Sequence, residues 1–145
     1  MVDSWITYGL FAAVAFGLNA VIYKYASVSG SVNPFFASAL FGAGIFFTFL
    51  VAYLLKFSPP AASTKSMGLI VLAGVVWALG FIMVAIAVSR GSDISRLAVI
   101  YNTNTLVAVV LGILVLKELP SASSAWKVIL GSIFVVAGAI LVSLK

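Results

Sequence analysis

The sequence predicts an all-α integral membrane protein with five transmembrane helices. Hydrophobic residues make up 64% of the 145 positions, whereas soluble proteins contain roughly 45–50%. Charged residues make up only 8%, against roughly 25% in soluble proteins, which is too few to cover a surface that faces water. The apolar residues also fall in five long runs, each near the roughly 20 residues that a helix needs to cross the hydrocarbon core.

Polar segments separate the five runs and set the expected ends of the helices. In order along the chain, the predicted spans cover residues 6–26, 35–56, 67–89, 94–116 and 125–144. The four prolines all lie between these runs, at positions 34, 59, 60 and 120. A proline does least harm there, because it lacks the N–H that a helix interior needs. We expect the five spans to form one membrane domain over residues 1–145.

The composition excludes most enzyme classes. The chain contains no cysteine and no histidine, which removes thiol nucleophiles, imidazole bases and the usual zinc ligands. Its three acidic residues are Asp3, Asp93 and Glu118, and none lies in the middle of a span. Without paired carboxylates for acid–base chemistry, we expect no catalytic residue, no metal site and no cofactor. The basic residues stand singly near the predicted helix ends, as anchors do, so we expect no nucleic-acid partner.

The distribution of lysine and arginine gives no instruction on orientation. Lys56, Lys65, Lys117 and Lys127 belong to the side of the N-terminus, and Lys24, Arg90, Arg96 and Lys145 belong to the opposite side. Because cytoplasmic loops normally carry the excess of positive charge, four charges on each side leave two interpretations open. Either one or two of the charges lie too deep to count, or the chain inserts in both orientations.

Polar side chains inside the spans are the informative ones, because lipid rejects them. In the first span, Asn19 and Tyr23 share one helical face, and the Asn19 amide either joins helices or lines a solvated cavity. Lys24 either extends to the lipid headgroups or binds an anion. In the third span, Trp77 lies near mid-depth, one turn before Phe81. Its ring either packs against other helices or forms the wall of a cavity.

The fourth span contains the strongest local anomaly, five consecutive hydrogen-bonding side chains from Tyr101 to Thr105. Tyr101, Asn104 and Thr105 project on one face of a regular helix. These groups either hold neighbouring helices together or line a hydrated path or a binding site. Small residues, which let helix backbones approach closely, mark the expected packing faces: Gly9, Ala13, Gly17, Gly74, Ala108, Gly112, Gly131 and Gly138.

Several stretches together resemble one EamA-type repeat of the drug/metabolite transporter superfamily, which is distantly similar to the small multidrug resistance proteins. They are residues 12–26, with a glycine and a later lysine, residues 73–87, rich in Gly and Ala, and residues 105–118, which end in Glu118 and precede the glycine-spaced last helix. Two departures stand out. Thr105 occupies a position where the family pattern has proline, and the first span lacks the carboxylate of the small multidrug resistance proteins, which argues against proton-coupled export of cationic drugs.

The resemblance implies a transporter of small metabolites. Typical members resemble two such repeats in one chain, so this sequence is expected to be one half-unit of a ten-helix inverted-repeat transporter. We expect it to act in the bilayer as an antiparallel, dual-topology homodimer, which the charge balance favours. The alternative is a non-transporting or heteromeric subunit that packs with a partner through its small-residue faces. The absence of a targeting extension favours a prokaryotic cytoplasmic membrane.

In the homodimer, we expect the substrate site to lie between the protomers. The candidate substrate-binding residues are Asn19, Tyr23, Trp77, Tyr101, Asn104 and Thr105. Their neutral hydrogen-bonding groups and aromatic rings favour an uncharged or zwitterionic substrate over a bare cation, which would require carboxylates.

Overall fold

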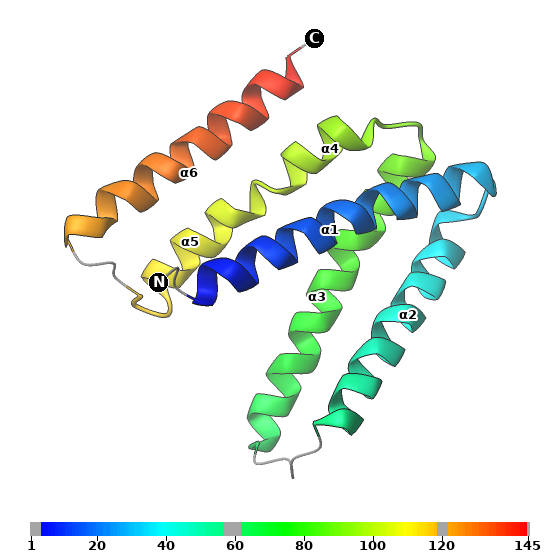
Figure 1. Cartoon of the computed structure of the whole chain (residues 1–145), viewed down its shortest axis with the longest axis horizontal. Helices are drawn as coiled ribbons and strands as arrows, with labels where there is room; N and C mark the ends of the chain where they lie inside the picture. The colour runs from blue at the N-terminus through cyan, green and yellow to red at the C-terminus, as the bar shows by residue number, and fades with distance from the viewer. Residues whose placement is uncertain (1–3, 57–61, 119–121, 145) are drawn as a thin grey trace. The chain divides into compact units, whose positions relative to one another are not determined.

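The computed structural model describes residues 4–56, 62–118 and 122–144, which form helices joined by short turns (Figure 1). In order, these helices are α1 (Ser4–Ser29), α2 (Pro34–Leu55), α3 (Thr64–Ser89), α4 (Ile94–Tyr101), α5 (Asn104–Leu114) and α6 (Ala122–Ser143). When α4 and α5 are counted as one segment, five helical segments in the described ranges are long and apolar enough to cross a membrane. The prediction of five spans is therefore confirmed. Pro59, Pro60 and Pro120 lie outside the described residues.

The fourth predicted span differs from the structure, because it is interrupted rather than continuous. Helix α4 ends at Tyr101, and α5 begins at Asn104 and ends at Leu114, two residues before the predicted end. At Asn102 and Thr103 the ψ angles are −8° and −9°, far from the roughly −42° of an α-helix.

Two threonine hydroxyl groups explain the interruption. The Thr103 hydroxyl donates to the Ile100 carbonyl at 2.7 Å, and the Thr105 hydroxyl donates to the Asn102 carbonyl at 2.8 Å. The backbone N–H groups of the same threonines also bond three residues back, to the same two carbonyls. Side chains that compete for backbone carbonyls in this way tighten a helix into 3₁₀ turns and bend it.

The chain divides into two compact units, Met1–Ser92 and Asp93–Lys145. In the first unit, α2 lies along α3, and the C-terminal half of α1 packs against the C-terminal half of α3 (Figure 1). In the second unit, α6 packs beside both α4 and α5. We call these unit 1 and unit 2, and describe each by itself.

The turn after α1 is held by two backbone hydrogen bonds. The N–H of Ser31 donates to the Val28 carbonyl at 3.1 Å, and the N–H of Val32 donates to the Ser27 carbonyl at 3.0 Å. This is the Schellman arrangement, which requires a left-handed residue after the helix. Ser31 occupies that position with a φ of 48°, although glycine is the usual choice there.

The turn after α3 has the same construction, with glycine in the left-handed position. Gly91 has a φ of 87°. Its N–H donates to the Val88 carbonyl at 3.0 Å, and the N–H of Ser92 donates to the Ala87 carbonyl at 3.1 Å. Because both turns are short, α2 begins at Pro34, soon after α1 ends at Ser29, and α4 begins at Ile94, soon after α3 ends at Ser89.

Burial is sparse and is confined to unit 1. Among the described residues only Tyr23, Ala37, Ala85 and Val88 are buried. The exposed helix surfaces are largely apolar in both units. Such surfaces suit lipid contact, because helices satisfy their backbone polar groups internally.

Candidate functional site

Tyr23 on α1 is the centre of the only buried cluster in the part of the chain that the structure describes. Its side chain is 9% exposed, beside Ala37 and Ala85. The ring meets the rings of Phe41 and Phe81 edge to face, with centroid distances of 5.8 and 4.9 Å. This is the preferred geometry for aromatic pairs. Tyr23 therefore joins α1 to both α2 and α3.

The hydroxyl group of Tyr23 is the unsatisfied part of this cluster. Its Oη is buried and has no hydrogen-bond partner among the described residues. A buried polar group without a partner costs about 1–3 kcal/mol, a cost that phenylalanine would avoid at the same position. The packing of the ring therefore does not explain the presence of a tyrosine.

Trp77 on α3 extends the cluster beyond Phe41 and Phe81. Phe41 and Phe81 are stacked with centroids 4.3 Å apart, and Trp77 is stacked against Phe81 at 5.4 Å, with only 10° between the ring planes. Trp77 also lies 6.0 Å from Phe41. Trp77 therefore packs against aromatic neighbours, while its side chain remains 52% exposed.

A groove between α1 and α2 adjoins this cluster. It has a volume of about 550 Å³, and Asn19, Tyr23 and Phe41 are among its lining residues. Its other walls are aliphatic, contributed by Ala15, Leu18, Ile22, Ala26 and Leu40. Sites for small molecules have this character, apolar walls with a few polar groups. The structure thus brings two of the predicted site residues, Asn19 and Tyr23, into one groove and connects Trp77 to it through Phe41.

Lys24 has a third arrangement, which the sequence did not suggest. Its Nζ donates a hydrogen bond of 2.9 Å to the backbone carbonyl of Ser92, and the contact is partly buried. Ser92 closes the turn that follows α3, where helix carbonyls carry partial negative charge. The ammonium group therefore ties the end of α1 to the end of α3.

The other predicted polar residues belong to unit 2. Tyr101 is the last residue of α4 and is half-buried, whereas Asn104 and Thr105 begin α5 and are exposed. Thr105 is bound to the Asn102 carbonyl. Within the described ranges, the Asn104 amide makes no hydrogen bond. Tyr101 and Asn104 therefore lie on the two sides of the interruption between α4 and α5.

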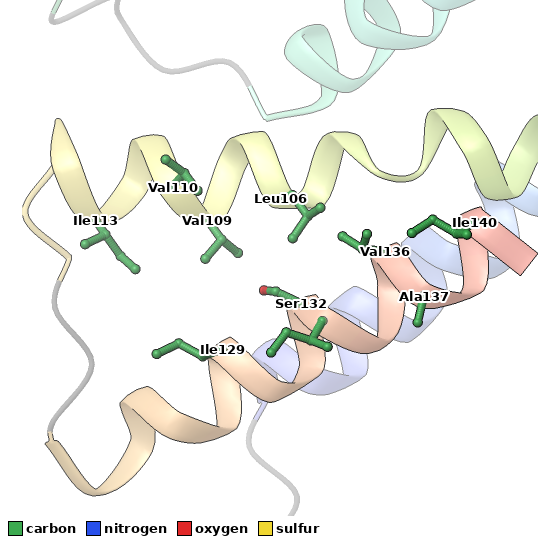
Figure 2. Close-up of a pocket in the computed structure, with 10 residues that line it drawn as sticks. Leu106, Val109, Val110, Ile113, Ile129, Ser132, Val136, Ala137 and Ile140 are labelled. Atoms are coloured by element: carbon green, nitrogen blue, oxygen red, sulfur yellow. The ribbon is translucent and has the colours of Figure 1, made fainter.

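Unit 2 also contains a groove, between α5 and α6, with a volume of about 470 Å³. Figure 2 shows Leu106, Val109 and Ile113 of α5 opposite Ile129, Ser132 and Val136 of α6. Ser132 provides the one polar side chain among the ten lining residues. None of the six predicted substrate-binding residues lines this groove, and its chemistry suits packing better than recognition.

Arg96 performs in unit 2 the role that Lys24 performs in unit 1. Its Nε donates to the Val142 carbonyl at 3.3 Å, and its Nη2 donates to the Leu144 carbonyl at 3.1 Å. These are carbonyls at the C-terminal end of α6, which lack partners within the helix. The planar guanidinium group suits this role because it presents several donors in a fixed fork.

The predicted packing glycines are open in the structure. A Cβ atom added at Gly9, Gly17, Gly74, Gly131 or Gly138 would meet no atom within 4 Å. At Gly112 it would lie 3.3 Å from a carboxylate oxygen of Glu118. Ala13 and Ala108 are exposed. These small residues are therefore available to other helices, and their role in packing remains a prediction.

Phe41 is the member of the cluster that the sequence analysis missed. The second span contains several phenylalanines, and Ser38, one turn before Phe41, does not by itself distinguish this ring from its lipid-facing neighbours. The only available signal was indirect, the pairing of Trp77 with Phe81 one turn later, which predicts a ring from a neighbouring helix.

The helices, their apolar surfaces and the polar groups within them define a multi-pass integral membrane protein. The chain matches the EamA-like transporter family over residues 3–144, nearly its whole length. It therefore belongs to this family and to the drug/metabolite transporter superfamily, whose members are transporters rather than enzymes. No curated protein and no solved structure matches the chain.

Proposed function

We propose that this protein transports small uncharged or zwitterionic metabolites across a prokaryotic cytoplasmic membrane, as an antiparallel homodimer with the substrate site between the protomers. The observation that carries the proposal is the pair Asn19 and Tyr23 in one groove. Both are polar and lie within a span, and the buried hydroxyl of Tyr23 has no hydrogen-bond partner among the described residues. Lipid strongly disfavours such groups, so a substrate or water is the expected partner.

The family and the number of helices support the homodimer part of this proposal. Inverted repeats with a site at their interface are a general plan of secondary transporters. Five spans form one half of a ten-helix arrangement, and a second, oppositely oriented copy supplies the other half. The four-to-four balance of lysine and arginine and the open faces of the glycines support this assembly. Each protomer then contributes Asn19, Tyr23, Trp77, Tyr101, Asn104 and Thr105.

Transport is tested with purified protein in liposomes and a panel of labelled neutral and zwitterionic metabolites. Asn19→Leu and Asn104→Ala are each expected to lower the initial uptake rate at least tenfold without changing the amount of folded dimer. If both variants transport like the parent protein, the site assignment is wrong. If the purified parent protein transports none of the panel but does so with a second five-span chain, the heteromeric subunit is the correct description.

Orientation is tested by cysteine labelling, which is clean because the chain has no cysteine. Ala62 and Ser29 are exposed and lie beyond opposite ends of α2, so Ala62→Cys and Ser29→Cys report opposite sides of the membrane. Intact cells are treated with an impermeant maleimide before and after lysis. Comparable partial labelling of both variants is expected for dual topology. Labelling at one position only would overturn the antiparallel homodimer.

A further inference from the structure

We propose that the substrate bound in the groove of unit 1 is an uncharged molecule with a planar aromatic ring and one or two hydrogen-bonding groups. This inference rests on the proposed function and narrows it. It assigns the polar edge of the substrate to Asn19 and the Tyr23 hydroxyl. It assigns the ring to Phe41, which lines the groove and stacks with Phe81 and Trp77.

We expect the substrate to be uncharged because of the residues that line the groove. None of the eight residues that line it is charged. The nearest cation in sequence, Lys24, donates to the Ser92 carbonyl. A charged group is costly to move into an apolar site that lacks an opposite charge. A substrate without net or separated charges therefore fits this groove best.

We expect the substrate to contain an aromatic ring because of how the rings of the cluster are arranged. Phe41, Phe81 and Trp77 lie within 30° of parallel to one another, and Phe41 also lines the groove. A planar ring beside Phe41 extends this stack, and an aromatic pair contributes about 0.5–1.5 kcal/mol beyond the area that it buries. A saturated ring of equal size would bury similar area without that contribution.

The hydrogen-bonding groups expected on the substrate follow from the two polar side chains that line the groove. Asn19 and Tyr23 are four residues apart and lie on one face of α1, and both line the groove. The amide both donates and accepts, and the hydroxyl does the same. A hydroxyl or ring N–H on the substrate therefore finds a partner at the Asn19 amide, and a substrate that enters beside the Tyr23 ring would bring a partner to the buried hydroxyl. Binding would relieve the orphaned Tyr23 hydroxyl, which the ring contacts alone leave unexplained.

The test measures binding of radiolabelled 2-naphthol to the purified protein in detergent micelles by scintillation proximity. The competitors are decahydro-2-naphthol, which keeps the hydroxyl and loses the aromatic rings, and naphthalene, which keeps the rings and loses the hydroxyl. We expect saturable binding, with each competitor at least tenfold weaker than unlabelled 2-naphthol. Equal competition by decahydro-2-naphthol would overturn the aromatic requirement, and equal competition by naphthalene would overturn the polar edge.

Variants assign the binding to this groove. Tyr23→Phe and Asn19→Leu are each expected to weaken 2-naphthol binding at least fivefold. The matched control is Tyr25→Phe, which removes a hydroxyl from the same helix at a residue that is 75% exposed, and it should bind like the parent. Size-exclusion chromatography and circular dichroism establish that each variant is folded. Parent-like binding by folded Tyr23→Phe and Asn19→Leu would overturn the site.

The outcome separates this inference from the proposed function. Absence of saturable naphthol binding, with liposome uptake of another metabolite intact, would overturn only the substrate class. Saturable binding without uptake of any metabolite would support the site and overturn transport by the purified chain.

Discussion

The ammonium group of Lys24 on α1 donates a 2.9 Å hydrogen bond to the backbone carbonyl of Ser92, at the end of the turn after α3. These residues are 68 positions apart in sequence. The contact joins the C-terminal ends of two helices beside the aromatic cluster, and it uses the favourable interaction between a cation and the carbonyl end of a helix.

Lys24→Met is expected to lower the stability of the protein, because it leaves the Ser92 carbonyl without its donor. A hydrogen bond to a charged group contributes about 1.5–3 kcal/mol, and the partial exposure of this contact brings the expected loss to about 1 kcal/mol. Thermal melting in detergent measures the loss. Arg90→Met removes an exposed cation near the same turn and serves as the control, so an equal shift in both variants would contradict the specific role of Lys24.

Tyr23→Phe is expected to raise stability while it impairs binding. The substitution keeps the ring contacts with Phe41 and Phe81 and removes the unpartnered hydroxyl, a gain of about 1 kcal/mol. Tyr23→Ala removes the ring as well and should cost about 3 kcal/mol or more. The midpoint of thermal unfolding in detergent ranks the three proteins. A less stable Tyr23→Phe variant would mean that the hydroxyl already has a partner in the folded protein.

The turn after α1 predicts opposite effects for two adjacent substitutions. Ser31→Gly places glycine in the left-handed conformation and so removes the steric strain of a side chain there. It should stabilise the protein by about 1 kcal/mol. Gly30→Ala should destabilise it by about 1–2 kcal/mol, because its Cβ would lie 2.9 Å from Val32 Cγ2 and 3.1 Å from the Ala26 carbonyl oxygen. Gly68→Ala is the control, since a Cβ there meets nothing within 4 Å. Thermal melting measures all three, and similar shifts for Gly30→Ala and Gly68→Ala would refute the steric argument.

Arg96→Met should loosen the last turn of α6. The Val142 and Leu144 carbonyls would lose their guanidinium donors, and amide hydrogen exchange at residues 140–144 should accelerate severalfold, as local fraying predicts. Arg96→Lys should give an intermediate rate, because an ammonium group lacks the planar fork. Exchange in α5 is the internal reference, and acceleration there to the same extent would indicate general unfolding of unit 2 instead.

The spans were predictable from the sequence because the bilayer imposes a simple requirement. A long apolar run must become a helix there, since its backbone polar groups find no water. The interruption of the fourth span has a different physical cause, the hydrogen bonds of side chains to the helix backbone. The hydropathy of the sequence does not predict that the hydroxyl groups of Thr103 and Thr105 bond to nearby backbone carbonyls. The polar run from Tyr101 to Thr105 nevertheless lies where the helix is interrupted.

The candidate site was predictable in part. Asn19 and Tyr23 stood out because they are polar residues in a span, and the structure gives them a common groove. Phe41 did not stand out, because a phenylalanine that faces a ring and one that faces lipid have the same sequence signature. From the sequence, Lys24 is expected to extend to the lipid headgroups or to bind an anion. Its acceptor in the structure is a backbone carbonyl, a group that every residue has and that no sequence pattern reveals.

The boundary between the two units falls between Ser92 and Asp93. On one side, Ser92 is anchored through both its N–H, bound to Ala87, and its carbonyl, bound to Lys24. On the other side, the Asp93 carbonyl already accepts the N–H groups of Arg96 and Leu97. Within the described residues the Asp93 N–H makes no hydrogen bond, so rotation about its φ and ψ breaks none of these bonds. The φ and ψ angles of Asp93 are therefore two backbone dihedrals that none of these hydrogen bonds restrains.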